Sequence, residues 1–88
     1  MLILSRRVGE SIIIDGKFTA TVAVVGADFV DLGLCERDGT QLGCVTLNTR
    51  QRAHVVRGVS GIMIERMEQG RVRLGFDAPK RISIKRSG

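Results

Sequence analysis

Ser11-Ile12-Ile13-Ile14-Asp15-Gly16 is the segment of this chain that most strongly predicts how the chain folds. The first four residues are mostly β-branched and form a run too short for a helix, which favours a strand. Asp-Gly is a typical two-residue turn of a β-hairpin. Because a second β-rich run follows at residues 18–25, these residues predict an antiparallel hairpin.

The rest of the chain shows the same alternation of short apolar runs and turn residues, which is typical of a mainly β fold. We predict further strands at residues 2–7, 29–34, 44–47, 61–67, 71–75 and 81–85. The first four strands, up to residue 34, are expected to form a meander. The middle segment predicts one short helix, Thr49–Val56, capped by Asn48 and ended by Gly58. A faint repeat relates residues 22–34 to residues 62–76.

Length and composition indicate one domain, residues 1–88, with an aliphatic core. Hydrophobic residues make up 43% of the chain, but it has only three Phe and no Trp or Tyr. The formal net charge is +5, and residues 59–88 hold seven basic against three acidic side chains. This imbalance favours an anionic partner such as nucleic acid.

Several functions are disfavoured by the residues that are present. No nucleophile motif, Walker loop or dinucleotide-binding motif occurs, so we expect no enzyme, no cofactor and no small-molecule substrate. Cys35, Cys44 and His54 have no metal-ligand spacing, so we expect no metal. No signal peptide or membrane span is evident, so we expect a cytoplasmic protein, without membrane association, whose two cysteines form no disulfide.

Both ends of the chain are apolar strands that finish in adjacent basic residues, Arg6-Arg7 and Lys85-Arg86. If the two strands lay side by side, they would form a basic edge suited to a polyanion, because arginine can hold phosphates and base edges. The same residues could instead merely protect exposed sheet edges. The three Phe fall in apolar strands and are expected in the core, so recognition would not depend on stacked aromatic rings.

The two ends resemble the carbon storage regulator (CsrA/RsmA) family of small RNA-binding proteins. The resemblance is carried by Leu4-Ser5-Arg6-Arg7-Val8-Gly9-Glu10 and by Val72–Arg86, which includes Gly75-Phe76-Asp77-Ala78-Pro79-Lys80. It covers the blocks 1–19 and 61–88. It implies a barrel-like antiparallel β fold formed by an interlocked homodimer, in which the first strand of one chain lies beside the last strand of the other.

The resemblance also implies a function: binding of GGA sequences in mRNA leader hairpins, with effects on translation or mRNA stability and titration by small decoy RNAs. The RNA-binding residues carried over from the family are Leu4, Ser5, Arg6, Arg7, Ala78, Pro79, Lys80, Ile84, Lys85 and Arg86. Of these, Arg6 and Arg86 are implied to hold phosphates or base edges, and Leu4 and Ile84 to pack under the nucleotides. The backbone of the Ala78-Pro79 turn is implied to read guanines.

The chain departs from the family in its middle and at its end. Residues 20–60 intervene between the two family-like blocks, and the family's C-terminal helix has no counterpart after Arg86. The middle could be an insertion that decorates a family core. Alternatively, residues 1–57 could be a degenerate first copy and residues 59–88 a second half-copy. These departures leave a second function open: a protein-interaction module that pairs with a typical family member without binding RNA.

Overall fold

A computed structural model describes residues 2–50, 54–56 and 60–87 of the protein, and all the regular structure in these residues is β-strand. Nine strands follow one another along the chain. Their bounds are β1 Leu2–Arg7, β2 Ser11–Ile14, β3 Phe18–Val25, β4 Phe29–Glu36, β5 Gln41–Asn48, β6 His54–Val56, β7 Ser60–Glu68, β8 Arg71–Asp77 and β9 Ile84–Ser87. The expected mainly β fold is therefore confirmed.

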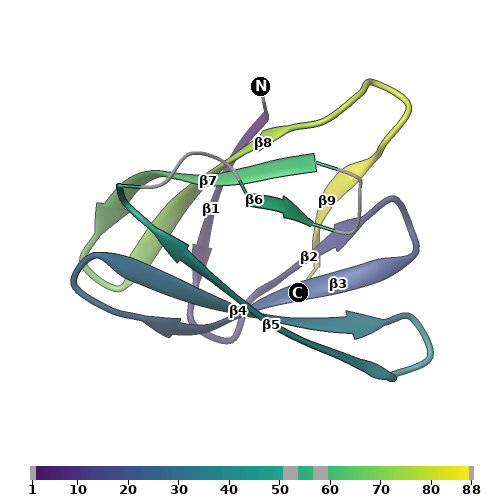
Figure 1. Ribbon diagram of the computed structural model, residues 1–88, viewed down its shortest axis with the longest axis horizontal. Helices are drawn as coiled ribbons and strands as arrows, with labels where there is room; N and C mark the ends of the chain where they lie inside the picture. Colours follow the sequence, from purple (N-terminus) through teal and green to yellow (C-terminus); the bar gives the residue numbers. More distant parts are fainter. Residues whose placement is uncertain (1, 51–53, 57–59, 88) are drawn as a thin grey trace.

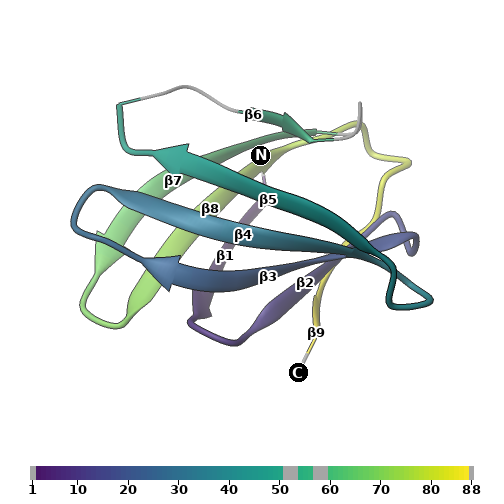
Figure 2. The same cartoon turned by 60° about the horizontal axis from the view of Figure 1, so that its bottom comes forward.

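The strands form two antiparallel sheets that face each other (Figures 1 and 2). Sheet A has the order β1-β8-β7-β6, and sheet B has the order β5-β4-β3-β2-β9. The chain leaves sheet A at the turn of residues 7–10, where the Glu10 N–H donates to the Arg7 carbonyl at 3.0 Å. It returns to sheet A between β5 and β6, and it crosses back to sheet B before β9. The two ends of the chain therefore belong to different sheets.

The core lies between the sheets and is almost wholly aliphatic, as the composition predicts. In β1, β2, β3 and β4, alternate residues are buried, in agreement with the two-residue period of a half-buried strand. The largest fully buried side chains are Phe76, Ile12, Ile14, Leu32, Leu47, Ile62, Leu74, Val22, Val30 and Val72. Each sheet contributes to this list, so the core holds the two layers together.

The predicted hairpin turn at Asp15-Gly16 is confirmed. Both residues have positive φ, 56° and 61°, as a type I′ turn requires. The Lys17 N–H closes the turn by donating to the Ile14 carbonyl at 3.1 Å. This turn aligns β2 with β3 so that Ile12 and Ile14 enter the core together.

The β3–β4 and β7–β8 hairpins occupy equivalent places in the two sheets. Val22 pairs with Leu32 beside a bulge in β3, and Ile64 pairs with Leu74 beside a bulge in β7. The equivalence extends to the outer strands: β1 pairs with β8 in sheet A, and β5 pairs with β4 in sheet B. Strands β1–β4 and β5–β8 thus form two like units, and each gives its first strand to the sheet of the other. Among the described strands, β9, which pairs with β2, has no counterpart.

Three expectations for the fold need correction. The predicted helix Thr49–Val56 is wrong: residues 49 and 50 form a turn, residues 54–56 form β6, and residues 51–53 lie outside the described part. The first four strands are not one meander, because β1 joins sheet A while β2, β3 and β4 join sheet B. The last strand begins at Ile84 rather than at residue 81, because residues 78–83, which include Pro79, form a loop.

We predict that Gly26→Ala destabilises the β3–β4 hairpin. A methyl group at Gly26 would overlap the ring of Phe29, whose carbonyl also accepts a hydrogen bond from the Gly26 N–H at 2.8 Å. Overpacking of this kind costs about 1–3 kcal/mol. Chemical denaturation should show this loss. Gly33→Ala is the matched control, because nothing lies within 4 Å of its new methyl group; equal stability of the two variants would contradict the prediction.

Candidate nucleic-acid interface

The two basic ends of the chain lie on edge strands. β1 is one of the two edge strands of sheet A, opposite β6, and β9 is one of the two edge strands of sheet B, opposite β5. Figures 1 and 2 show them running in the same general direction. Each therefore keeps one side of its backbone without a partner strand among the described residues. We call β1, β9 and the loop of residues 78–83 the basic edge.

The register shows which side chains of the basic edge face inward, because cross-strand partners share a face. On β1, Leu4 pairs with Leu74 and Arg6 pairs with Val72. On β9, Ile84 pairs with Ile14 and Arg86 pairs with Ile12. The four partners are all buried core residues. Leu4, Arg6, Ile84 and Arg86 are thus on the inner faces of the two edge strands, although β1 and β9 are not hydrogen-bonded to each other as neighbours in one sheet.

The two inner arginines differ sharply in exposure. The Arg6 side chain is only 9% exposed, whereas Arg86 is exposed. Arg6 Nε donates to the Ser5 carbonyl at 2.8 Å, and Nη1 lies 3.4 Å from the Ser11 carbonyl oxygen. Its Nη2 is 3.9 Å from the Glu10 carboxylate. Arg6 therefore ties the end of β1 to the start of β2, and it is not offered to a ligand in this conformation.

We predict that Arg6→Ala lowers the free energy of unfolding, while Arg7→Ala does not. Arg6 is a buried cation that donates to backbone carbonyls, and a hydrogen bond to a charged group is worth about 1.5–3 kcal/mol. Arg7 is exposed and tests the loss of one positive charge at the neighbouring position. Urea denaturation should separate the two variants; an equal midpoint for both would contradict a supporting role for Arg6.

The remaining predicted residues are accessible to different degrees. Arg7, Pro79, Lys80 and Lys85 are exposed, whereas Ser5 and Ala78 are half-buried. Two hydrogen bonds hold the loop of residues 78–83: the Ile82 N–H donates to the Pro79 carbonyl at 2.9 Å, and the Ser83 carbonyl accepts from the Asp15 N–H at 2.7 Å. The structure thus places Lys80 and Lys85 on a loop and strand that are tied to sheet B.

The outer face of sheet A holds cations that the sequence did not identify as site residues. Arg73 pairs with Ser5 in the register, and Arg71 pairs with Arg7. Arg71 and Arg66 each form an ion pair with Glu68, at 3.2 Å and 3.5 Å. Arg73 remains exposed beside them, as does Arg7, which is one of the predicted RNA-binding residues. The strict alternation of Arg71-Val72-Arg73-Leu74 was the signal that could have assigned them to one outward face.

Within the described residues, the basic edge occurs once, despite the likeness of the two units. The register places Leu47, beside Val30, where Arg6 lies beside Val72. Asp31 occupies the position of Arg73, and it accepts a hydrogen bond from the Thr46 hydroxyl at 2.6 Å. The positions on β5 and β4 are therefore uncharged or acidic where the corresponding positions on β1 and β8 are basic. Any anion site built on these edge strands has one good location per chain.

The chemistry available to the basic edge is binding. Exposed arginine and lysine side chains can hold phosphates, and the open strand edges supply backbone donors and acceptors. No group of three metal-ligating side chains occurs within the described ranges, and Cys35 and Cys44 are free thiols there. The part of the chain that the structure describes also holds no helix long and apolar enough to cross a membrane.

Comparisons with known proteins identify no relative of this chain. No family model, curated protein or solved structure matches this chain. The fold and the basic edge thus define a class only: a small two-layer antiparallel β protein with one cationic edge.

Proposed function

We propose that the protein is a cytoplasmic RNA-binding regulator that recognises GGA sequences in mRNA leader hairpins and thereby affects translation or mRNA stability. The observation that carries the proposal is the basic edge. Two edge strands from opposite ends of the chain, with exposed Arg86, Lys85 and Lys80, combine cations with unpaired backbone groups. Sequence-specific RNA recognition favours single-stranded loops whose bases are open to such contacts.

The residues of the basic edge fall into groups with different roles in this proposal. Arg86 and Lys80 engage phosphates or guanine edges, and the backbone of Ala78 and Pro79 reads the guanines. Half-buried Ile84 gives an apolar support for the nucleotides. Because Arg6 and Leu4 are buried, we assign them to the support of β1 rather than to direct RNA contact.

Titration with two RNA hairpins tests the proposal. One hairpin has GGA in its loop, and the matched hairpin has CCU at the same place. We expect a clear preference for GGA at moderate salt, because non-specific phosphate attraction is the same for both and cannot discriminate between them. Equal, weak affinity for both hairpins would overturn the proposal and leave only attraction between charges.

A second candidate function rests on the open edges of β1 and β9. Edge strands accept an added strand from another protein, which is the basis of β-augmentation. The protein could therefore pair with another β protein and modulate it without binding RNA. A saturating concentration of the GGA hairpin should then leave binding of that protein partner unchanged. If the edge binds RNA instead, the hairpin should block binding of the partner.

The interlocked homodimer is a separate proposal that follows from the resemblance alone. In the structure, β1 pairs with β8 and β9 pairs with β2 of the same chain. If two chains exchanged strands, β1 and β9 of one chain would have to pair with β8 and β2 of the second copy instead. Light scattering over a range of concentrations tests it: a dimer mass supports exchange, and a monomer mass supports the single chain with its one basic edge.

A further inference from the structure

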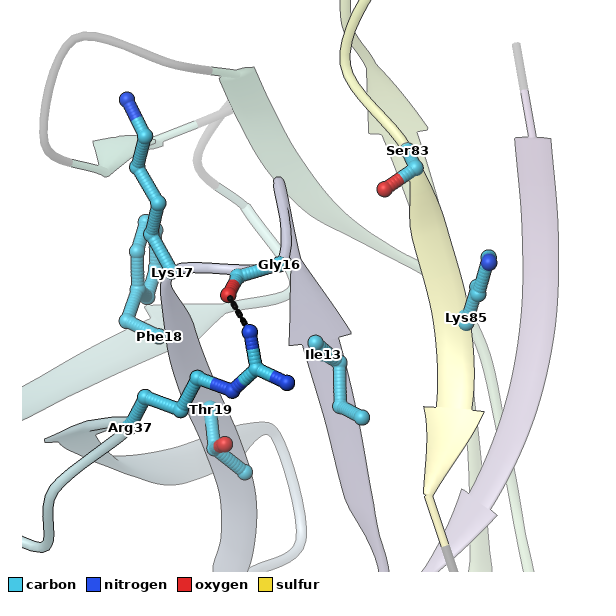
Figure 3. A pocket seen from close by; sticks show the side chains of 8 residues that line it. All are labelled: Ile13, Gly16, Lys17, Phe18, Thr19, Arg37, Ser83 and Lys85. Atoms are coloured by element: carbon cyan, nitrogen blue, oxygen red, sulfur yellow. Dashed lines mark hydrogen bonds between the residues drawn. The ribbon is translucent and has the colours of Figure 1, made fainter.

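A shallow pocket of about 240 Å³ lies on the outer face of sheet B, beside β9 (Figure 3). It is formed where the β2–β3 turn, the start of the β4–β5 turn and the end of the loop before β9 meet. Its floor is Ile13 and Thr19, and the charged side chains at its rim are Lys17, Arg37 and Lys85. Ser83 adds a hydroxyl group, which Figure 3 shows on the same side of β9 as Ile13.

The charge of this pocket is one-sided. All three charged residues that line it are basic, and no carboxylate lines it. Lys17 is 79% exposed, and its ammonium group is 3.6 Å from the Asp15 carboxylate, so this lysine is partly neutralised. Arg37 and Lys85 are exposed and form no ion pair within the described residues. Two unneutralised cations beside a floor of Ile13 and Thr19 favour an anion that rests on that floor.

Arg37 is held in place for such a ligand. Its Nη1 lies 3.4 Å from the Gly16 carbonyl oxygen, and its own N–H donates to the Lys17 carbonyl at 3.2 Å. The turn that carries it is closed by the Thr40 N–H, which donates to the Asp38 carboxylate at 2.9 Å. This contact and the Thr40 hydroxyl keep the pKa of Asp38 below its usual value. The remaining N–H groups of the Arg37 guanidinium stay free for a second acceptor.

β9 connects the pocket to the basic edge. Successive residues of a strand point to opposite faces. Lys85 pairs with Ile13 on the outer face and lines the pocket, whereas Arg86 pairs with Ile12 on the inner face. A polyanion bound along the free side of β9 can therefore reach both arginine and lysine, one on each face of the same edge strand.

We propose that this pocket binds a phosphate group, and that in the RNA complex it holds a backbone phosphate of a nucleotide adjoining the GGA sequence. The identity of the polyanion rests on the proposed function; the phosphate site itself does not. Because a phosphate contact carries no sequence information, the pocket adds affinity and salt dependence but no preference for GGA.

Two measurements test the pocket, and Arg37→Ala is the variant for both. With the GGA and CCU hairpins, we expect Arg37→Ala to lower affinity about threefold to tenfold for each, and to reduce the salt slope by about one unit, with the GGA preference unchanged. Arg66→Ala is the matched control: it removes the same charge from the outer face of sheet A, where Arg66 already pairs with Glu68. An equal effect of the two variants on affinity would contradict the proposal that this pocket binds phosphate.

The second measurement uses inorganic phosphate and needs no RNA. We expect phosphate, but not chloride at equal ionic strength, to shift the amide NMR signals of Gly16, Lys17, Ser83 and Lys85, and Arg37→Ala to reduce these shifts. Phosphate shifts without a GGA preference would sustain the pocket and defeat the RNA proposal. A different outcome would contradict the phosphate site but not the RNA proposal. In that outcome the protein prefers GGA, phosphate shifts no signals, and Arg37→Ala behaves like Arg66→Ala.

Discussion

Arg86→Ala is expected to weaken binding of the GGA hairpin by about tenfold or more, since a hydrogen bond to a charged group is worth about 1.5–3 kcal/mol. Arg86 is the exposed arginine of the two on the inner faces of the edge strands. Its removal should not unfold the chain, because its side chain packs in no core position. Fluorescence anisotropy with labelled hairpin measures the loss.

Arg66→Ala serves as the control for Arg86→Ala, because it removes an equal charge from a side chain that is 66% exposed and lies on β7, in the other sheet from β9. We expect it to change affinity only slightly. The unfolding midpoint of each variant should match the unsubstituted protein. If Arg86→Ala binds the GGA hairpin as well as Arg66→Ala does, the assignment of the RNA site to β9 fails.

Leu74→Ala is expected to cost about 2–5 kcal/mol of stability, the usual range for a large-to-small change in a core. Leu74 is fully buried on β8, where it pairs with Leu4 on one side and Ile64 on the other. The total free energy of unfolding of a small domain is about 5–15 kcal/mol, so the variant should lose much of its resistance to urea.

Leu2→Ala is the matched control for the core. Leu2 lies on β1, but it is 42% exposed, so removal of the same atoms creates little cavity. Equilibrium unfolding in urea should give a much smaller change for Leu2→Ala than for Leu74→Ala. Similar losses of stability would contradict the structure, in which Leu74, on β8 between β1 and β7, lies in the core between the two sheets.

Local patterns predicted the strands well. The expected bounds of β1, β2 and β3 agree with the structure, because each is a short apolar or β-branched run ended by a turn residue. The Asp15-Gly16 turn was equally local, since its positive φ angles depend on those two residues alone. The alternation of polar and apolar residues in β8 agrees with the burial of Val72 and Leu74 in the core.

Features that depend on distant contacts were not predicted. Residues 54–56 pair with β7, and this pairing overrides the weak local preference for a short helix. The pairing of β1 with β8, and of β2 with β9, joins opposite ends of the chain, so no local pattern reveals it. The burial of Arg6 follows from the pairing of β1 with β8, and the position of Arg37 beside the β2–β3 turn follows from the pairing of β3 with β4.

An amide NMR titration of the protein with the GGA hairpin tests the central claim most directly. We expect the largest shifts in β9 and in residues 78–80, smaller shifts in β1 and at Arg37 in the β4–β5 turn, and few shifts in β4 and β5 themselves. The CCU hairpin should produce weaker shifts. Shifts centred on another surface, or the same shifts with both hairpins, would contradict the claim that the basic edge recognises RNA by sequence.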